Sequence, residues 1–301
     1  MENENGATEA SSERFKELDR WPLNRTLEEL VAANRRAVEA VERALPQLEA
    51  AAGAIVERVA VGGRLVYAGA GTSGRVALQD AAELPPTFGF DRTVVLIAGG
   101  IDAGARAREG AEDDVDAAAF DIAAANVSSI DTVIGIAASG RTPYTVAVLH
   151  AAAERGALTV GMSNNPGTPL LEVADFPVCL ETGPEVLAGS TRLAAGTAQK
   201  VALNALSTAV LVQLGGAYRN LMMGMAASNT KLRQRAVAIV AGAAGTGEDS
   251  ARQALETASG SIRVAIVCLR AGIEPTAARK LLEAHQNRVR DALEAMGVDS
   301  A

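Results

Sequence analysis

The chain has 301 residues, 49% of them hydrophobic, which is enough to bury a sizeable core. Only 3% of the residues are aromatic and the formal net charge is -8, so the composition argues against a nucleic-acid-binding surface. Residues 1–13 are polar and acidic, and no apolar run approaches the roughly 18 residues of a membrane span. We therefore expect a cytoplasmic protein without a signal peptide and without a membrane span.

The chain is expected to begin with a flexible segment and then to form helix. Residues 1–20 are polar and predict a flexible N-terminal segment. Apolar residues at helical spacing run through Leu27–Val61 and predict a long helical stretch. Because a proline kinks or divides a helix, Pro46 predicts a kink in this stretch or two separate helices.

Apolar strands then alternate with helical patterns, and this alternation predicts an α/β fold: a doubly wound, parallel five-stranded sheet flanked by helices. The expected strands are Arg64–Ala68, Thr93–Ala98, Thr132–Ala137, Leu158–Ser163 and Phe176–Leu180. The expected helices end at Glu83, lie within Ala105–Asn126, and cover Pro143–Glu154. Pro85 and Pro86 are expected to stop the first of these helices.

After Glu181 the pattern predicts helices only. A long apolar helix is expected over Arg192–Leu214, one or two more over Arg219–Ala243, and three short helices over residues 247–297. We expect the sheet and its helices to form one domain, residues 21–243, and residues 247–301 to form a small helical appendage.

The turn after the first strand carries glycines at Gly69, Gly71 and Gly74, a spacing that matches the dinucleotide-binding fingerprint. That fingerprint also needs an acidic residue at the end of the second strand, where this chain has Gly99-Gly100. The same turn fits a plain glycine turn without a ligand, or an anion site at the start of a helix.

A second turn, Ser139-Gly140-Arg141-Thr142-Pro143, follows another buried strand and favours the anion site. In a parallel sheet both turns lie at the carboxyl ends of the strands, where ligands bind. Hydroxyl and N–H donors at such turns suit a sugar phosphomonoester better than a pyrophosphate. The candidate donors are Thr72, Ser73, Ser139, Gly140 and Thr142, and Arg141 would add positive charge or remain solvated.

The cysteines and histidines do not form a metal-binding pattern. Cys179 and Cys268 each lie in an apolar run, which is typical of buried free thiols, and His150 and His285 lie far apart. We therefore expect no metal ion and no nicotinamide cofactor. His285 is either structural or a group that assists sugar ring opening.

The two turns resemble those of sugar isomerase (SIS) domains. Three longer segments, Asp80–Gly89, Glu109–Asp113 and Ala195–Lys200, resemble the N-acetylmuramic acid 6-phosphate etherases, and so do Asn220–Met222 and Asn229–Leu232. The chain departs from the usual family pattern at Ala194, where a basic residue is usual, and at Gly224, where an Asp is usual. It also has Arg35-Arg36 where the family usually carries acidic residues.

The resemblance implies a homodimer that cleaves the lactyl ether of a 6-phosphorylated amino sugar, in the recycling of cell-wall sugar, without metal or redox cofactor. It implies that Glu112 is a base and that Glu83, at the end of a helix and against prolines, is a protonated acid. It also points to Ser190 and Lys231 as substrate contacts, although both equally fit a surface or helix-cap role.

Two other functions share these features. An aldose–ketose sugar-phosphate isomerase would use the same turns and a base at C2, but it would not release lactate. A non-enzymatic regulator that senses a sugar phosphate would use the same fold, because a fold does not determine a function. Such a regulator usually carries a separate segment that binds DNA or a partner, and residues 1–20 are too short and too acidic for that role.

Overall fold

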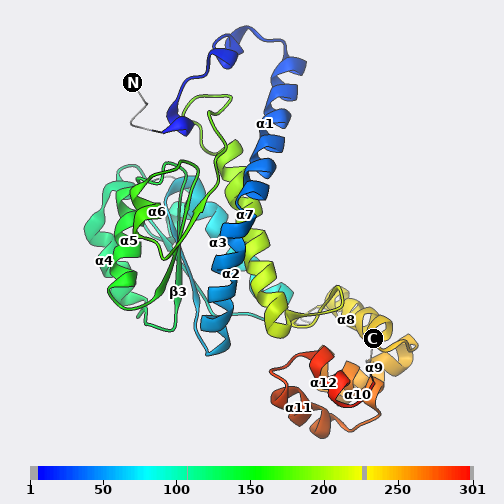
Figure 1. The fold of residues 1–301 in the computed structure, drawn as a ribbon. Helices are drawn as coiled ribbons and strands as arrows, with labels where there is room; N and C mark the ends of the chain where they lie inside the picture. The colour runs from blue at the N-terminus through cyan, green and yellow to red at the C-terminus, as the bar shows by residue number, and fades with distance from the viewer. Residues whose placement is uncertain (1–5, 107, 226–228, 299–301) are drawn as a thin grey trace. The chain divides into compact units, whose positions relative to one another are not determined.

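The computed structural model describes residues 6–106, 108–225 and 229–298 (Figure 1). The chain forms two compact units. The first comprises the residues up to Ala82 together with Arg92–Thr208, and the second comprises Glu83–Asp91 and the residues from Ala209 onward. No helix within the three described ranges is long and apolar enough to cross a bilayer.

The first unit contains the expected five-stranded sheet, and all of its strand pairs are parallel. The strands are β1 (Leu65–Gly69), β2 (Thr93–Ile97), β3 (Thr132–Ala137), β4 (Leu158–Ser163) and β5 (Phe176–Cys179). Their order in the sheet is β2-β1-β3-β4-β5. The winding direction therefore reverses between β1 and β3, which makes the gap between their carboxyl ends the topological switch point.

Helices cover both faces of this sheet, as Figure 1 shows. One face carries α4 (Val115–Ala124), α5 (Pro143–Ala153) and α6 (Pro169–Val173), and the other carries α2 (Leu45–Ala60) and α3 (Gly71–Phe88). The remaining long helices are α1 (Leu23–Arg43) and α7 (Ala194–Leu211). Pro46 divides α1 from α2, as expected, since it lies in the first turn of the new helix.

Continuous apolar strands explain why the sheet is covered on both sides. Every residue of β1, β3 and β4 is buried, the pattern that strands of a parallel sheet show when helices pack on both faces. The core on the α4–α5 side is aliphatic and rich in alanine, with Val66, Val133, Ile122, Val148 and Leu149 fully buried. These strands hold the turns at their carboxyl ends in fixed positions.

The prediction that Pro85 and Pro86 stop the helix at Glu83 is wrong. α3 continues to Phe88 with both prolines inside it. A proline removes one helical N–H and crowds the carbonyl four residues earlier, so near a helix end it disturbs only the last turns. The backbone N–H of Gly89 donates to the carbonyl of Pro85 at 2.9 Å, and the helix ends because Gly89 adopts a φ of +66°.

The N-terminal residues carry short helical turns where the composition predicts a flexible segment. These turns are η1 (Ala7–Glu9), η2 (Glu13–Phe15) and η3 (Leu18–Arg20). Thr8 and Phe15 are buried, and the Phe15 and Trp21 rings meet edge to face with centroids 6.2 Å apart. Residues 6–20 are therefore packed against the first unit.

The second unit contains a strand pair that the sequence does not predict. β6 (Ala217–Tyr218) and β7 (Leu221–Met222) form an antiparallel hairpin, so the prediction of helix only after Glu181 is wrong. Strands this short show no alternation that a sequence pattern could detect. The positive φ of Arg219, +56°, closes the turn without the glycine that usually marks a hairpin.

The described residues 229–298 of the second unit form five helices around one apolar core. They are α8 (Thr230–Ala244), α9 (Glu248–Thr257), α10 (Ile262–Ala271), α11 (Pro275–Ala284) and α12 (Val289–Ala295). Four of them lie beyond residue 247, where the sequence predicts three. The last break is made by Gln286 and Asn287 at φ values of +55° and +58°, not by glycine or proline, so composition does not reveal it.

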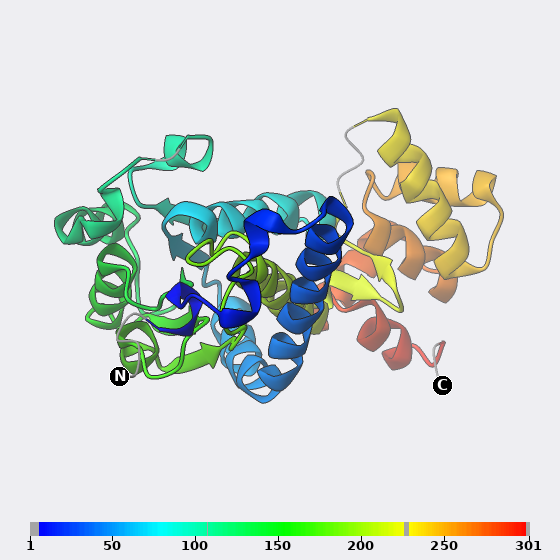
Figure 2. The same ribbon diagram turned by 90° about the horizontal axis from the view of Figure 1, so that it is seen from above.

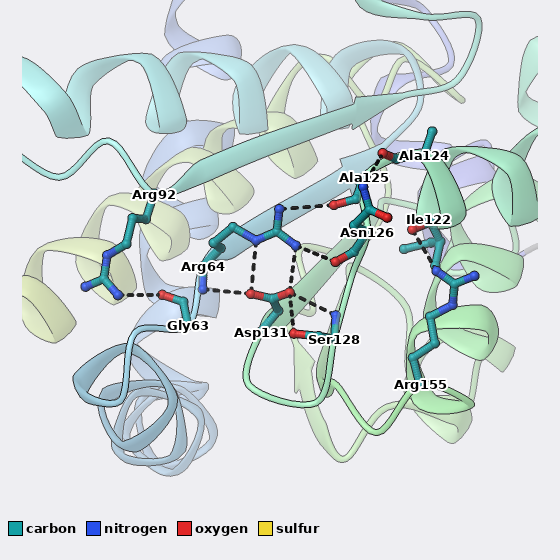
Figure 3. Close-up of polar contacts among 10 residues, drawn as sticks. All are labelled: Gly63, Arg64, Arg92, Ile122, Ala124, Ala125, Asn126, Ser128, Asp131 and Arg155. Atoms are coloured by element: carbon teal, nitrogen blue, oxygen red, sulfur yellow. Dashed lines mark hydrogen bonds and ion pairs between the residues drawn. The ribbon is translucent and has the colours of Figure 1, made fainter.

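An ion pair joins β1 to β3 at the amino edge of the sheet (Figure 3). The Asp131 carboxylate accepts from the backbone N–H, Nε and Nη2 of Arg64, at 3.0, 3.1 and 2.7 Å, and from the N–H of Ser128 at 2.9 Å. Burial alone would raise the pKa of Asp131, but these donors outweigh it and lower the pKa to about 2. The pair is therefore a pH-dependent stabilising contact.

We predict that Asp131→Asn lowers the free energy of unfolding at pH 7 by about 2 kcal/mol, the equivalent of the pKa shift. Because the folded pKa is depressed, the contribution is present above the ordinary Asp value of 3.8 and is lost as the pH falls toward 2. Urea unfolding of both proteins across this range measures the difference, with the exposed Glu154→Gln as a control. Equal stability at pH 7 would contradict the assignment.

Candidate functional site

The two hydroxyl-bearing turns lie at the carboxyl ends of neighbouring strands. β1 and β3 pair in register, with Gly69 opposite Ile136, so the residues that follow them leave the sheet at the same level. This is the switch point of the sheet, where open α/β folds bind ligands. We therefore take the two turns as the candidate active site, and call the segment Ser139–Thr142 the β3 turn.

The first turn is shorter than the sequence suggests. β1 ends at Gly69 and α3 begins at Gly71, so Thr72 and Ser73 lie in the first turn of the helix rather than in a loop before it. Ser73 is buried and Thr72 half-buried. Backbone N–H groups in a first helical turn have no helical acceptor, so this turn offers donors to an anion.

Close packing explains the fingerprint-like glycines. A Cβ on Gly69 would lie 2.9 Å from the backbone N of Gly74, and a Cβ on Gly74 would lie 2.9 Å from the carbonyl of Gly69. Both glycines are thus required where the strand meets the helix, whether or not a ligand binds. The spacing gives no support to a dinucleotide site.

Two hydroxyl side chains, those of Thr168 and Ser163, pack closely against Gly140 of the β3 turn. Gly140 has a φ of +67°, and a Cβ there would lie 2.3 Å from Thr168 Oγ1 and 2.4 Å from Ser163 Oγ. The N–H of Gly140 donates to Ala137, and the N–H of Arg141 donates to Ser139 Oγ at 3.1 Å. The donors left for a ligand are thus the hydroxyl and the N–H of Ser139 and the N–H groups that open α5.

Buried polar residues that the sequence does not single out as site residues support this turn. The Asn164 N–H and the Asn165 side-chain amide both donate to the carbonyl of Ala138, at 3.0 and 2.9 Å. Thr168 is 1% exposed, and its hydroxyl has no hydrogen-bond partner. The one signal in the sequence is the pair of asparagines directly after a buried strand, at the edge where ligands bind.

The N-terminus of α7 is already bound by a carboxylate of the protein, that of Glu185. The buried Glu185 carboxylate accepts from the N–H groups of Ala194 and Ala195 at 3.0 and 2.9 Å. Burial raises the pKa of Glu185, while these two N–H donors and the charge of Arg36 oppose the rise. The start of α7 is thus occupied, whereas Thr142 makes no side-chain cap at α5.

A buried hydrogen-bond network fixes α3 against β1 and α7. Asp80 accepts from the Tyr67 hydroxyl at 2.9 Å, from Asn204 Nδ2 at 2.6 Å and from Ser207 Oγ at 3.2 Å. Burial first, and then the Asp80 charge, raise the pKa of Tyr67 well above its usual value, so the phenol stays a donor. Thr72 at the start of the same helix packs beside Gly196 of α7.

The structure brings Glu112 to the same edge of the first unit. Glu112 is exposed in η5 (Ala111–Asp113), which packs against α5, and Ala111 lies beside Gly99 at the end of β2. Arg141 is exposed on the β3 turn. Ser190 is half-buried in the loop that leads into α7.

Other candidate residues belong to the second unit. Glu83 is exposed and lies within α3 rather than at its end, so the expectation of a partly buried, helix-terminal carboxyl is wrong for the single chain. Lys231 is exposed in the first turn of α8, and His285 is half-buried at the end of α11.

One departure from the etherase pattern has a steric cause. A Cβ on Gly224 would lie 1.7 Å from the carbonyl oxygen of Phe88, so no side chain fits there. The N–H of Ala194 bonds to Glu185, and Arg36 supplies positive charge near that carboxylate. Nothing in the structure explains Arg35.

The parallel sheet and its paired turns define a SIS-domain protein. The SIS domain model matches residues 111–209, and the model of the glucokinase regulatory protein N-terminal SIS domain matches residues 47–153. A solved Bacteroides fragilis protein involved in capsule formation shares the fold, with a TM-score of 0.51 and 21% identity over 66% of this chain and 95% of that chain.

Curated relatives show to which family of SIS-domain proteins the chain belongs. The chain is 52% identical to the N-acetylmuramic acid 6-phosphate etherase of Deinococcus radiodurans over 75% of each chain. It is 48% identical to the etherase of Symbiobacterium thermophilum, over 87% of this chain and 88% of that one. It is also 48% identical to the etherase of Rubrobacter xylanophilus, over 85% of this chain and 86% of that one. The chain belongs to the N-acetylmuramic acid 6-phosphate etherase family.

We predict that Gly140→Ala impairs ligand binding more than it impairs folding. The added methyl group would collide with Thr168 and Ser163 and would force an alanine into a left-handed conformation, which displaces the β3 turn. Binding of N-acetylglucosamine 6-phosphate, measured by calorimetry, should fall at least tenfold, or about 1.4 kcal/mol. Gly167→Ala, at a φ of +58° with open space around it, is the matched control. Equal losses in the two variants would contradict the prediction.

Proposed function

We propose that the protein cleaves the D-lactyl ether of N-acetylmuramic acid 6-phosphate and releases N-acetylglucosamine 6-phosphate and D-lactate. The observation that carries the proposal is the pair of donor-rich turns at the switch point of a chain in the etherase family. A chain with a net charge of -8 needs a local source of positive potential for an anionic substrate. The first turns of α3 and α5 supply it through their N–H groups and dipoles.

The reaction follows from the chemistry of the sugar. In the ring-opened form C1 is an aldehyde, which makes the C2 proton acidic, and the ether oxygen is on C3. Removal of the C2 proton, with departure of lactate from C3, gives an unsaturated aldehyde to which water adds at C3. These steps need a base at C2, an acid at the ether oxygen and an anchor for the phosphate.

We assign the base to Glu112 and the acid to Glu83. Glu112 lies at the carboxyl edge of the sheet in a segment packed on α5, the helix that follows the β3 turn. Thr72, Ser73, Ser139, Gly140, Arg141 and Thr142 would hold the phosphate and sugar hydroxyls, with Ser190 and Lys231 as further contacts. The two carboxyl groups carry all proton transfers in this scheme.

We infer that Glu83 does not act on the substrate held by its own chain. Ala82, its neighbour in the chain, is ten residues beyond Thr72 on α3, which at 1.5 Å per residue is about 15 Å. About six covalent bonds separate the phosphorus from the C3 oxygen, a reach below about 9 Å. We therefore propose a homodimer in which Glu83 acts on the substrate held by the other chain.

An exposed apolar stripe supports self-association. Leu23, Leu27, Val31 and Val38 fall on one face of α1 at helical spacing and are 41% to 75% exposed. Exposed apolar side chains gathered on one face of a helix are typical of a protein–protein contact. The cytoplasmic location remains a prediction from the sequence.

Isotope incorporation tests the mechanism. We predict that product formed in heavy water carries deuterium at C2 and that its C3 oxygen comes from water, because the C2 proton passes to the enzyme and exchanges. Mass spectrometry of the product measures both labels. Lactate release without deuterium at C2 would favour direct hydrolysis, and isomerised sugar without lactate would favour an isomerase.

Mixed dimers test the two glutamates. We predict that Glu83→Gln and Glu112→Gln each reduce lactate release by at least about a hundredfold, as loss of a general acid or base does. Only Glu83→Gln should retain C2 exchange, since its base is intact. Mixing the two variants should restore about a quarter of wild-type activity, because half of the dimers are mixed and each has one complete site. Glu109→Gln is the control; no recovery on mixing would place both residues in one chain's site.

A further inference from the structure

The segment that the sequence assigns to a flexible terminus contacts Asn165, which supports the β3 turn of the candidate site. We call residues 6–20 the N-terminal strap. In Figure 2 the strap, in dark blue, runs across the first unit from the N-terminus to the start of α1. It is held at several points: Phe15 is buried, Arg14 pairs with Glu29 at 2.6 Å, and the Glu9 carboxylate lies close to Gly189. The strap is thus part of the folded first unit.

The most deeply buried of these contacts is made by Thr8, which has no exposed surface. Its N–H donates to Asn165 Oδ1 at 3.2 Å, and Asn165 Nδ2 donates to Thr8 Oγ1 at 2.9 Å. Nδ2 also donates to the carbonyl of Ala138 at 2.9 Å. An amide nitrogen has two hydrogens, so Thr8 and Ala138 use both, and the strap fixes how Asn165 is oriented toward the turn.

The carbonyl of Ala138 belongs to the same peptide unit as the N–H of Ser139. A trans peptide is planar, so a carbonyl held in place also fixes the direction in which the adjoining N–H points. Asn164 and Asn165 hold this carbonyl from one side. The direction of the Ser139 N–H, at the start of the β3 turn, therefore depends on the hydrogen bonds from Asn165 to Thr8 and to Ala138.

We propose that Thr8 is a positioning residue for the phosphate turn: through Asn165 it holds the Ala138–Ser139 peptide in the orientation that receives the anion. This rests on the proposed function, in which Ser139 contacts the substrate phosphate. Thr8 itself touches no substrate. Its removal leaves the donors present but no longer preorganised, so the loss falls on phosphate binding rather than on the proton transfers.

Thr8→Val tests the proposal, because valine keeps the shape and deletes the acceptor for Asn165. The KM for N-acetylmuramic acid 6-phosphate and the Kd for N-acetylglucosamine 6-phosphate should each rise about fivefold, the effect of one buried hydrogen bond, with kcat little changed. Thr8→Ser, which keeps the hydroxyl, should restore both values. Thr257→Val, a surface threonine of α9 in the second unit, is the matched control. Circular dichroism establishes that the variants are folded.

A double-mutant cycle with Asn165→Ala and the single variant Ser139→Ala together separate the possible failures. If Thr8 acts through Asn165, Thr8→Val should weaken binding much less in the Asn165→Ala background than alone. If Ser139→Ala weakens binding but Thr8→Val does not, the inference is overturned and the proposed function stands. If Ser139→Ala leaves binding unchanged, the phosphate site itself is misplaced. Fully additive effects, or a Thr8→Val loss confined to kcat, would also overturn the role of Thr8.

Discussion

The pairing of Arg64 with Asp131 at the amino edge sets the geometry on which the site depends. The Asp131 carboxylate accepts both the backbone N–H and the guanidinium of Arg64, and Thr132 donates back to the Arg64 carbonyl. This fixes the register of β1 against β3 at one end. Because parallel strands rise equally per residue, the register at the amino end determines where both turns emerge at the other. The Arg64–Asp131 contact at the amino edge thus affects how the two turns at the carboxyl edge lie relative to each other.

At the carboxyl edge of the sheet, the helix starts differ in whether a carboxylate of the protein already binds their N–H groups. Glu185 accepts from the first N–H groups of α7, whereas the starts of α3 and α5 carry hydroxyl residues. A carboxylate at α7 also repels an anion that approaches that end. The candidate site therefore has the starts of α3 and α5 as its sources of N–H donors, whereas the first N–H groups of α7 already bind Glu185.

The sequence predicts the order of the βα units and both turns because each depends on a local pattern: a buried apolar run, then glycine and hydroxyl residues. It fails where the structure depends on distant partners. Pro85 and Pro86 are tolerated near a helix end, Tyr218 enters a hairpin of two-residue strands, and Thr8 is ordered by Asn165. Asn165 and Thr168 gain their roles from contacts with the β3 turn. The resemblance alone indicates Glu112, because an exposed glutamate has no local signature, whereas an expected helix-end position adds to the resemblance for Glu83.

The glycines at 69 and 74 bear on how sequence signatures are used. Each leaves room for the backbone of the other, so their spacing records how closely a strand and the following helix approach. Any fold with that tight crossover will conserve the same spacing whatever it binds, and a search keyed to the glycines alone will group unrelated chemistries. The residue at the end of the neighbouring strand β2 distinguishes the ligands. In dinucleotide-binding proteins an acidic side chain there hydrogen-bonds the ribose, whereas this chain has Gly99 and Gly100.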